Sequence, residues 1–297
     1  MKTLIITADD FGNSIPINEA VEQGHTKGVL SAASLMVSGP AFEDAVHRAR
    51  RLPHLGVGLH LTLVDGKPVL PPDEIPDLAG PNGRFCADAT KQGVALFFSS
   101  AMRRQARAEI RAQFERFRST GLALDHVNGH QHFHLHPVVV SELAALLPEY
   151  GAPPVRRPVE PFRPSFRAQQ DRFLGRSFNA LFFSIQSARL KPLFKTGTKS
   201  NDAVFGFNDT GNMTADRLAR YLTVLPEGVT EIYLHPATRR WDGPDNLPPH
   251  YRPVDEFAAL LDANVQAALK QLALSPVSFA QAFRAQNLDN QKPGVGL

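Results

Sequence analysis

The chain has 297 residues, enough for one large α/β domain or two small ones, and its 43% hydrophobic and 21% charged residues are ordinary for a soluble globular protein. A formal net charge of +3 is too small to indicate nucleic acid as a partner, and a single cysteine, Cys86, excludes an internal disulfide and a metal site built from several cysteines. The N-terminal apolar run is too short for a signal peptide and no window approaches the roughly 20 apolar residues of a membrane span, so we expect a cytoplasmic protein.

Short apolar runs alternate with amphipathic segments along the chain. In order, we predict strand 3–8, helix 18–27, strand 29–37, helix 41–52, strand 56–63, helix 102–117, strand 122–129, helix 137–150, strand 155–157, helix 214–225, strand 229–234, helix 254–272 and strand 277–280. This alternation indicates a parallel sheet covered by helices, and about seven repeats favour a closed barrel over an open sheet. We therefore expect one α/β barrel domain over residues 1–297.

Two stretches interrupt this rhythm. Residues 67–84 are rich in Pro and Gly and are expected to form a long loop over one face of the barrel. Residues 158–201 form an insert in which eight basic residues between Arg163 and Lys199 stand against one acid, Asp171, among many Phe and Leu residues. A basic amphipathic segment of this kind is typical of contact with an anionic membrane or of a grip on a lipid tail. The alternative is an ordinary helical segment packed on the barrel.

Polar residues fall at the ends of four predicted strands. The first strand runs into Asp9 and Asp10, the third carries His60, the 122–129 strand leads into a histidine-rich segment, and the 229–234 strand ends at His235. In β/α barrels the active site forms at the carboxyl ends of the strands. These residues are therefore the candidates for one catalytic site.

Asp9 and Asp10 are adjacent in the sequence. Neighbouring strand residues face opposite sides, so both carboxylates can reach one site only if the chain bends after Ala8, and Phe11-Gly12 permits such a bend. Two carboxylates with different orientations suit two roles, in which one binds a cation and the other handles a proton. The alternative is an aspartate that caps a helix, next to a solvated neighbour.

His60 alternates with leucines along its predicted strand, which puts it inside the barrel; taken alone, a buried histidine bonded to a carbonyl explains it equally well. Residues 126–136 contain five histidines, each two or four residues after the last, which in a strand would form a row of roughly 33 Å along one face; one metal cannot gather them all. We expect the chain to leave the strand near His130 and to turn toward a helix at Pro137. One of these histidines would then bind metal, while others, among them His132 and His134, would meet substrate or supporting groups. A solvated histidine-rich loop is the alternative.

One Asp and two His ligands, with open positions for water or substrate, are typical of a catalytic metal site. Such ligands select weakly among Zn²⁺, Fe²⁺, Mn²⁺ and Mg²⁺. We expect one divalent ion, Zn²⁺ or Mg²⁺.

At these motifs the chain resembles the YdjC-like carbohydrate deacetylases, which are related in fold to the polysaccharide deacetylases. The resemblance covers almost the whole chain and rests on the motifs at residues 7–12, 56–61, 125–137 and 235–237. It implies a TIM-barrel-like fold, a metal bound by Asp10, His60 and His130, and a general base at Asp9. Many members have Asp-Ser where this chain has Asn128-Gly129, which leaves open which acidic group orients His130.

Residues 32–37, 63–66, 201–206 and 230–237 resemble the branch of that family associated with hopanoid biosynthesis. That branch implies a substrate in which N-acetylglucosamine is attached to a bacteriohopane polyol and is deacetylated to glucosamine. A soluble chito-oligosaccharide is the alternative substrate. A lipid-linked sugar would favour peripheral contact of residues 158–201 with the inner face of the cell membrane.

Two further residues complete the expected mechanism. His235 would protonate the departing amine, because an amide nitrogen cannot leave as an anion. Arg156 would pair with Asp9 and hold it ionised, unless it is a surface arginine like Arg157. A glycosidase would need two carboxylates at a defined separation across the bond, and a non-catalytic lipid or sugar carrier would need no cluster of acids and histidines. The resemblance therefore implies a metal-dependent N-deacetylase, with a glycosidase or a non-catalytic carrier as the alternatives.

Overall fold

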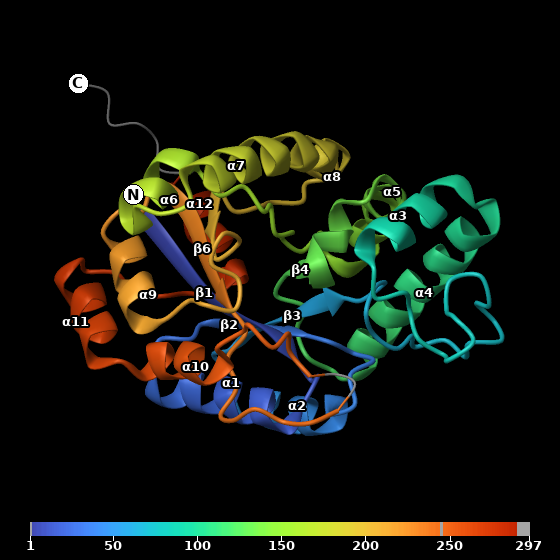
Figure 1. The fold of residues 1–297 in the computed structure, drawn as a ribbon, viewed down its shortest axis with the longest axis horizontal. Helices are drawn as coiled ribbons and strands as arrows, with labels where there is room; N and C mark the ends of the chain where they lie inside the picture. The colour runs from blue at the N-terminus through green and yellow to red at the C-terminus, as the bar shows by residue number, and fades with distance from the viewer. Residues whose placement is uncertain (1, 244–245, 290–297) are drawn as a thin grey trace.

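A computed structural model describes residues 2–243 and 246–289. Six parallel strands form one curled sheet in the order β4-β3-β2-β1-β6-β5, with helices around it (Figure 1). The strands are β1 Lys2–Phe11, β2 Ala32–Leu35, β3 Gly56–Leu61, β4 Val127–Gly129, β5 Ala203–Phe205 and β6 Gly228–Leu234. β1 lies at the centre of the sheet because its apolar run is buried on both faces, as in parallel sheets generally.

The two edge strands, β4 and β5, are bridged by an irregular segment, residues 154–159. On one side, the Val127 N–H donates to the Pro154 carbonyl and the Arg156 N–H donates to the Val127 carbonyl. On the other side, the Val204 N–H of β5 donates to the Val159 carbonyl. The α/β class and the barrel-like curvature agree with the sequence prediction. Five of the seven predicted strands are present, as β1, β2, β3, β4 and β6, whereas β5 was not predicted.

Helices connect the strands and cover the outside of the sheet (Figure 1). They are α1 Ile15–Lys27, α2 Phe42–Ala49, α3 Ala89–Phe98, α4 Ser100–Ser119, α5 Pro137–Leu146, α6 Phe162–Gln169, α7 Phe173–Ser187, α8 Lys191–Lys195, α9 Ala215–Leu222, α10 Pro253–Leu261, α11 Ala263–Gln271 and α12 Phe279–Asp289, with 3₁₀ turns at η1 His130–Leu135, η2 Leu147–Tyr150 and η3 Ala188–Leu190. Among the described residues, no helix has the length and apolar character needed to cross a membrane.

The side chains of β1 divide between an outer and an inner core. Leu4, Ile6 and Ala8 belong to the large core between the sheet and the helices. Ile5 points the other way, into the barrel, where it joins a small cluster with Val229 and with Phe279 of α12. α12 thereby closes the amino end of the barrel, which leaves the carboxyl ends of the strands for the polar residues.

Most predicted elements are present, but three predictions were wrong. The helix expected at 254–272 is two helices, because Asp262 between them is extended and its carboxylate caps α11 by accepting from two backbone N–H groups. The strand expected at 277–280 is instead the start of α12. At 155–157 only a single bridge forms, between Val155 and Val127, because the prolines at 153 and 154 lack the N–H groups that a regular ladder needs.

Candidate metal centre and active site

A pocket of about 420 Å³ opens at the carboxyl ends of the strands. Asp9, Asp10, His60, His130, His132 and His235 all line it. Its volume lies within the range of small-molecule sites. The fold therefore brings six of the eight predicted site residues to one surface.

Both aspartates reach this pocket because β1 is irregular at its end. The register with β2 shifts between Ala8 and Phe11, and Asp10 has a left-handed φ of 62°. The Gly12 N–H donates to the amide oxygen of Asn18, 2.8 Å away, which fixes the turn. Left-handed backbone is uncommon outside glycine, but aspartate adopts it more readily than most residues. The bend expected from the sequence is therefore present.

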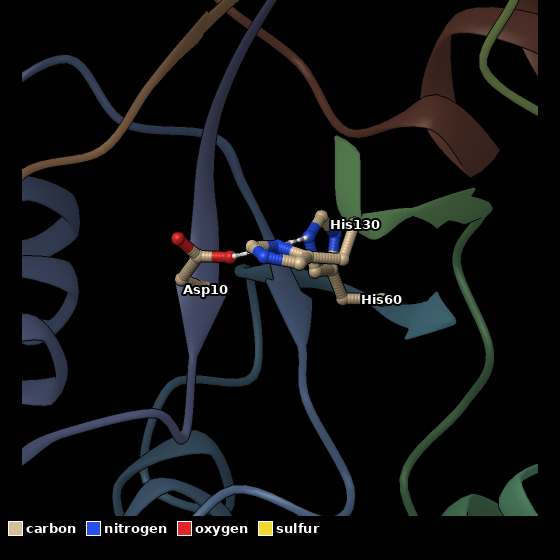
Figure 2. Close-up of side chains that lie close together, drawn as sticks. All are labelled: Asp10, His60 and His130. Carbon is tan, nitrogen blue, oxygen red and sulfur yellow. Dashed lines mark hydrogen bonds and ion pairs between the residues drawn. The ribbon is translucent and has the colours of Figure 1, made fainter. Parts of the chain in front are cut away.

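Asp10, His60 and His130 form the candidate metal centre (Figure 2). One oxygen of Asp10, Oδ1, lies 3.2 Å from His60 Nε2 and 3.1 Å from His130 Nδ1. The two histidine nitrogens are 3.4 Å apart. All three ligand atoms thus lie within 4.8 Å of one another, which is the arrangement that one cation requires.

Asn128 orients His60. Its amide nitrogen donates to Ser34 Oγ at 2.8 Å and to Asp9 Oδ1 at 3.3 Å, so its oxygen faces His60 Nδ1 at 2.7 Å. That oxygen can only accept, and therefore Nδ1 of His60 carries a proton. In the neutral ring this leaves the lone pair on Nε2, the nitrogen that faces Asp10. The tautomer of His60 fits a metal ligand, and a neutral amide rather than an acid sets it.

Asp9 belongs to a buried ion-pair network with Arg156 and Glu231. Two nitrogens of Arg156 donate to the two oxygens of Asp9, at 2.6 and 2.9 Å. The other edge of the guanidinium donates to Glu231 at 2.6 to 3.0 Å, and its face lies 4.6 Å from the ring of Tyr233. Arg156 is fully buried, so it is the ion-pair partner of Asp9 and not a surface arginine.

Both carboxylates are held in the ionised form. Burial acts to raise the pKa of Asp9, but the charges of Arg156 and His60 and the hydrogen bonds from Arg156 outweigh burial and hold this pKa well below its usual range. At Asp10, burial is likewise outweighed by the charges and hydrogen bonds of His130 and His60, which lower the pKa. The site therefore presents two ionised carboxylates with different partners.

His235 lies at the end of β6, where its backbone N–H donates to Glu256 Oε2 at 2.5 Å. Its ring is beside Tyr233 and Tyr251, and among the described residues no hydrogen-bond partner meets its Nδ1. Burial lowers the pKa of His235, against the opposing charges of Asp10 and Asp9. His235 therefore lines the pocket with an imidazole whose buried Nδ1 has no partner among the described residues.

The histidines of residues 126–136 make different contacts in the structure. The chain leaves β4 after Gly129 and passes through η1 to α5, as predicted, and Gln131 and His132 adopt left-handed φ values of 49° and 56° in this turn. His132 lines the pocket, with Nε2 at 3.3 Å from the Tyr233 hydroxyl. This turn therefore presents His130 and His132 to the pocket.

The other histidines lie outside the pocket. His134 is fully buried, and its Nε2–H donates to the carbonyl of Arg156 at 2.9 Å. His136 caps α5, and His126 is bonded to Asp125 and Ser34. The geometry of His134 fits support of the Arg156 backbone rather than contact with substrate, in contrast to the expectation from the sequence.

Sequence reasoning missed the buried acid that pairs with Arg156 and the aromatic residues of the pocket wall. Glu231 and Tyr233 alternate with Ile232 and Leu234 along β6 and point into the barrel with His235, so the two-residue period of this strand could have found them. Phe183 and Phe207, whose rings are 4.0 Å apart, also line the pocket. They come from the insert and from the loop after β5, and no local pattern joins them.

Comparisons with known proteins show which family the chain is similar to. A model of the family described as YdjC-like protein matches residues 3–271. The carbohydrate deacetylase of Mus musculus is 31% identical over 99% of this chain and 97% of that protein. The carbohydrate deacetylase of Brevibacillus brevis is 40% identical over 52% of this chain and 59% of that protein, so this alignment spans little more than half of each.

A solved structure shows the same fold. It is the crystal structure of a proposed cellobiose-phosphate cleavage protein from Enterococcus faecalis, with a TM-score of 0.69. The similarity covers 94% of this chain and 98% of that chain at 22% sequence identity.

Proposed function

Because the chain belongs to the YdjC-like family, we propose that it is a metal-dependent carbohydrate deacetylase. It would hydrolyse the N-acetyl group of an N-acetylglucosamine-containing substrate to the free amine and acetate. The observation that carries this proposal is the convergence of Asp10, His60 and His130 beside the Asp9–Arg156 ion pair in one pocket.

The three ligand residues suit a divalent ion, with Zn²⁺ or Mg²⁺ expected. When bound, such an ion supplies polarisation of the acetamide carbonyl and acidification of an attacking water. His60 contributes the lone pair of Nε2, because Asn128 holds its proton on Nδ1. The charge of the Asp10 carboxylate favours a cation at this place.

Asp9 and His235 would move the protons. Asp9, held ionised by Arg156, accepts a proton from the water that attacks the carbonyl carbon. His235, in its protonated form, donates to the amide nitrogen as the carbon–nitrogen bond breaks, and its lowered pKa makes that form a stronger acid. Water therefore supplies one oxygen of the acetate, and the nitrogen leaves as a neutral amine.

The sugar would lie against the wall made by His132 and Tyr233, which offer a ring nitrogen and a hydroxyl group. The apolar pair Phe183 and Phe207 would contact the group attached to the sugar. We propose that this group is a hopanoid lipid, with a soluble chito-oligosaccharide as the alternative. A lipid-anchored substrate requires an approach to a bilayer, and we place that approach at residues 158–201.

Acetate release tests the proposal. Purified protein is incubated with a water-soluble N-acetylglucosamine conjugate and with an N-acetylglucosaminyl hopanoid, each with and without a chelator. We expect acetate that disappears with the chelator and returns with added metal, and faster release from the hopanoid conjugate. Release of free sugar would favour a glycosidase, and binding without any product would favour a carrier; either result overturns the deacetylase.

A further inference from the structure

α7 carries an apolar stripe on its outer face. Leu174, Phe178, Leu181 and Ile185 are 80%, 66%, 64% and 62% exposed. Their spacing of four, three and four residues places them on one side of the helix. Phe173 and Phe182, 53% and 41% exposed, flank this stripe. A contiguous apolar surface of this kind on a soluble protein marks an interaction site.

Charge is distributed around the stripe, not within it. The only charged residue of α7 is Arg176, which is fully buried and bonded to Asp171 and Asp209. Exposed basic residues lie before the helix and after it: Arg163, Arg167, Arg189, Lys191, Lys195 and Lys199. Arg172 is also exposed but pairs with Asp209. The one acid between Arg163 and Lys199, Asp171, already pairs with Arg172, Arg176 and Arg217. The surface is therefore apolar at its centre and positive at both ends.

The inner side of α7 packs against the wall of the pocket. The ring of Phe183 is 4.0 Å from Phe207, and both line the pocket. Arg176 anchors the helix to Asp209, next to the pocket residue Thr210. Phe182, on the outer side, touches Phe183 with ring centroids 5.1 Å apart. An apolar path thus leads from the exposed stripe to the wall of the active site.

A second exposed apolar group lies on α3, where Val94, Phe97 and Phe98 are 55%, 53% and 77% exposed. α3 and the η3–α8 region both pack on α5. α7, α8, α5 and α3 all lie in the upper part of the view in Figure 1. The group on α3 is therefore a second exposed apolar group, separated from α8 by α5.

We propose that α7 lies flat on an anionic lipid bilayer, with its outer stripe in the hydrocarbon boundary and the basic residues at both ends against lipid phosphates. A second copy of the chain fits this surface less well, because pairing two stripes would bring basic ends together. This inference makes the proposed membrane approach of residues 158–201 more specific. It rests on the proposed function, because a lipid-linked sugar is presented at a bilayer surface.

Co-sedimentation with vesicles tests the inference. The wild-type protein is mixed with vesicles of phosphatidylcholine alone and of phosphatidylcholine with phosphatidylglycerol. We expect binding to the mixed vesicles that weakens at high salt, and weaker binding to the neutral ones. Leu174→Glu, and more strongly Leu174→Glu with Leu181→Glu, should weaken binding by at least about tenfold, because each places a charge at the apolar boundary.

The matched control is Leu272→Glu, an equally simple change at a residue 43% exposed beside α11, away from α7 (Figure 1). It should bind vesicles as the wild type does. Failure of the wild type to bind either vesicle, or equal binding by the double variant, overturns the inference. A wild-type dimer that the double variant converts to a monomer overturns it in favour of self-association.

Activity on the water-soluble conjugate separates this inference from the proposed function. The double variant should release acetate from that conjugate at the wild-type rate and lose activity on substrate embedded in vesicles. No acetate from any variant would defeat the deacetylase proposal, while the vesicle measurement would still decide the docking surface.

Discussion

Asp9 and Asp10 are neighbours in the chain, yet they have separate partners. Asp10 faces two histidines, whereas Asp9 is held by a guanidinium that is itself shared with Glu231. Asn128 links the two halves, because one amide contacts both His60 and Asp9. Changes at single residues should therefore separate loss of metal from loss of proton transfer.

Asp9→Asn should lower kcat by about 10² to 10⁴-fold, the usual contribution of a general base, because the amide cannot accept the proton from water. Metal content should stay at the wild-type level, since Asp9 is not among the three candidate ligands. Acetate release and elemental analysis on the same preparations measure the two quantities. His60→Ala is the contrasting variant and should lose the metal. A near-normal rate for Asp9→Asn would exclude it as the base.

Asn128→Leu should weaken metal binding by about 10 to 100-fold, the usual cost of removing the group that orients a histidine ligand. The leucine leaves the Nδ1–H of His60 without its acceptor at 2.7 Å. Competition with a chromogenic chelator measures the affinity without reference to turnover. Asn128→Asp retains an acceptor and should keep more of the affinity than the leucine variant. Equal affinity in wild type and Asn128→Leu would show that His60 needs no such partner.

At the scale of elements, the site depends on contacts between segments that are distant in the chain. Glu256 of α10 accepts from the N–H groups of His235 and Met213, at 2.5 and 2.7 Å, and so ties the end of β6 to a loop and a helix. Inside the barrel, β3 approaches the 125–126 segment closely enough that glycine is required at position 58. We therefore expect substitutions at Glu256 and at Gly58 to change the stability of the protein.

Glu256 should make the protein less stable as the pH rises toward neutrality. Burial raises its pKa from 4.5 to about 7, so between these values the unfolded chain has released a proton that the folded protein still holds. The free energy of unfolding should fall across this interval by about 3 kcal/mol, at 1.36 kcal/mol per pH unit. Urea unfolding at several pH values measures this slope. Glu256→Gln should reduce the dependence of the unfolding free energy on pH. An unchanged dependence would show that other titrating groups cause it.

Gly58→Ala should lower the free energy of unfolding by about 1 to 3 kcal/mol, the typical cost of overpacking a core. A Cβ at this position would lie 2.5 Å from the ring of His126. Gly175→Ala is the matched control on the exposed helix α7, where a Cβ meets nothing closer than 3.9 Å and should add a little helix stability. Thermal unfolding of both variants distinguishes a local clash from a general effect of replacing glycine.

At the scale of the molecule, much of the barrel was predictable because its signals are local. The apolar run of β1, the alternation of His60 with leucines and the proline at the start of α5 all lie within a few residues of what they determine. The pairing of Arg156 with Glu231 joins residues that are 75 positions apart, and nothing near either one indicates the other. Long-range contacts of this kind, and the choice of which face of α7 is buried, are set by packing.

The plugged amino end of the barrel has a kinetic consequence. Ile5, Val229 and Phe279 fill the interior beneath Asp9, so the pocket communicates with solvent from the opposite end. In the proposed reaction, an acetyl group that reaches the candidate metal centre would enter ahead of its sugar, and the acetate formed there would lie behind the amine. The products should therefore leave in a fixed order, with the amine first and acetate second. Added acetate should then inhibit competitively with respect to substrate, whereas inhibition by added amine should not be competitive.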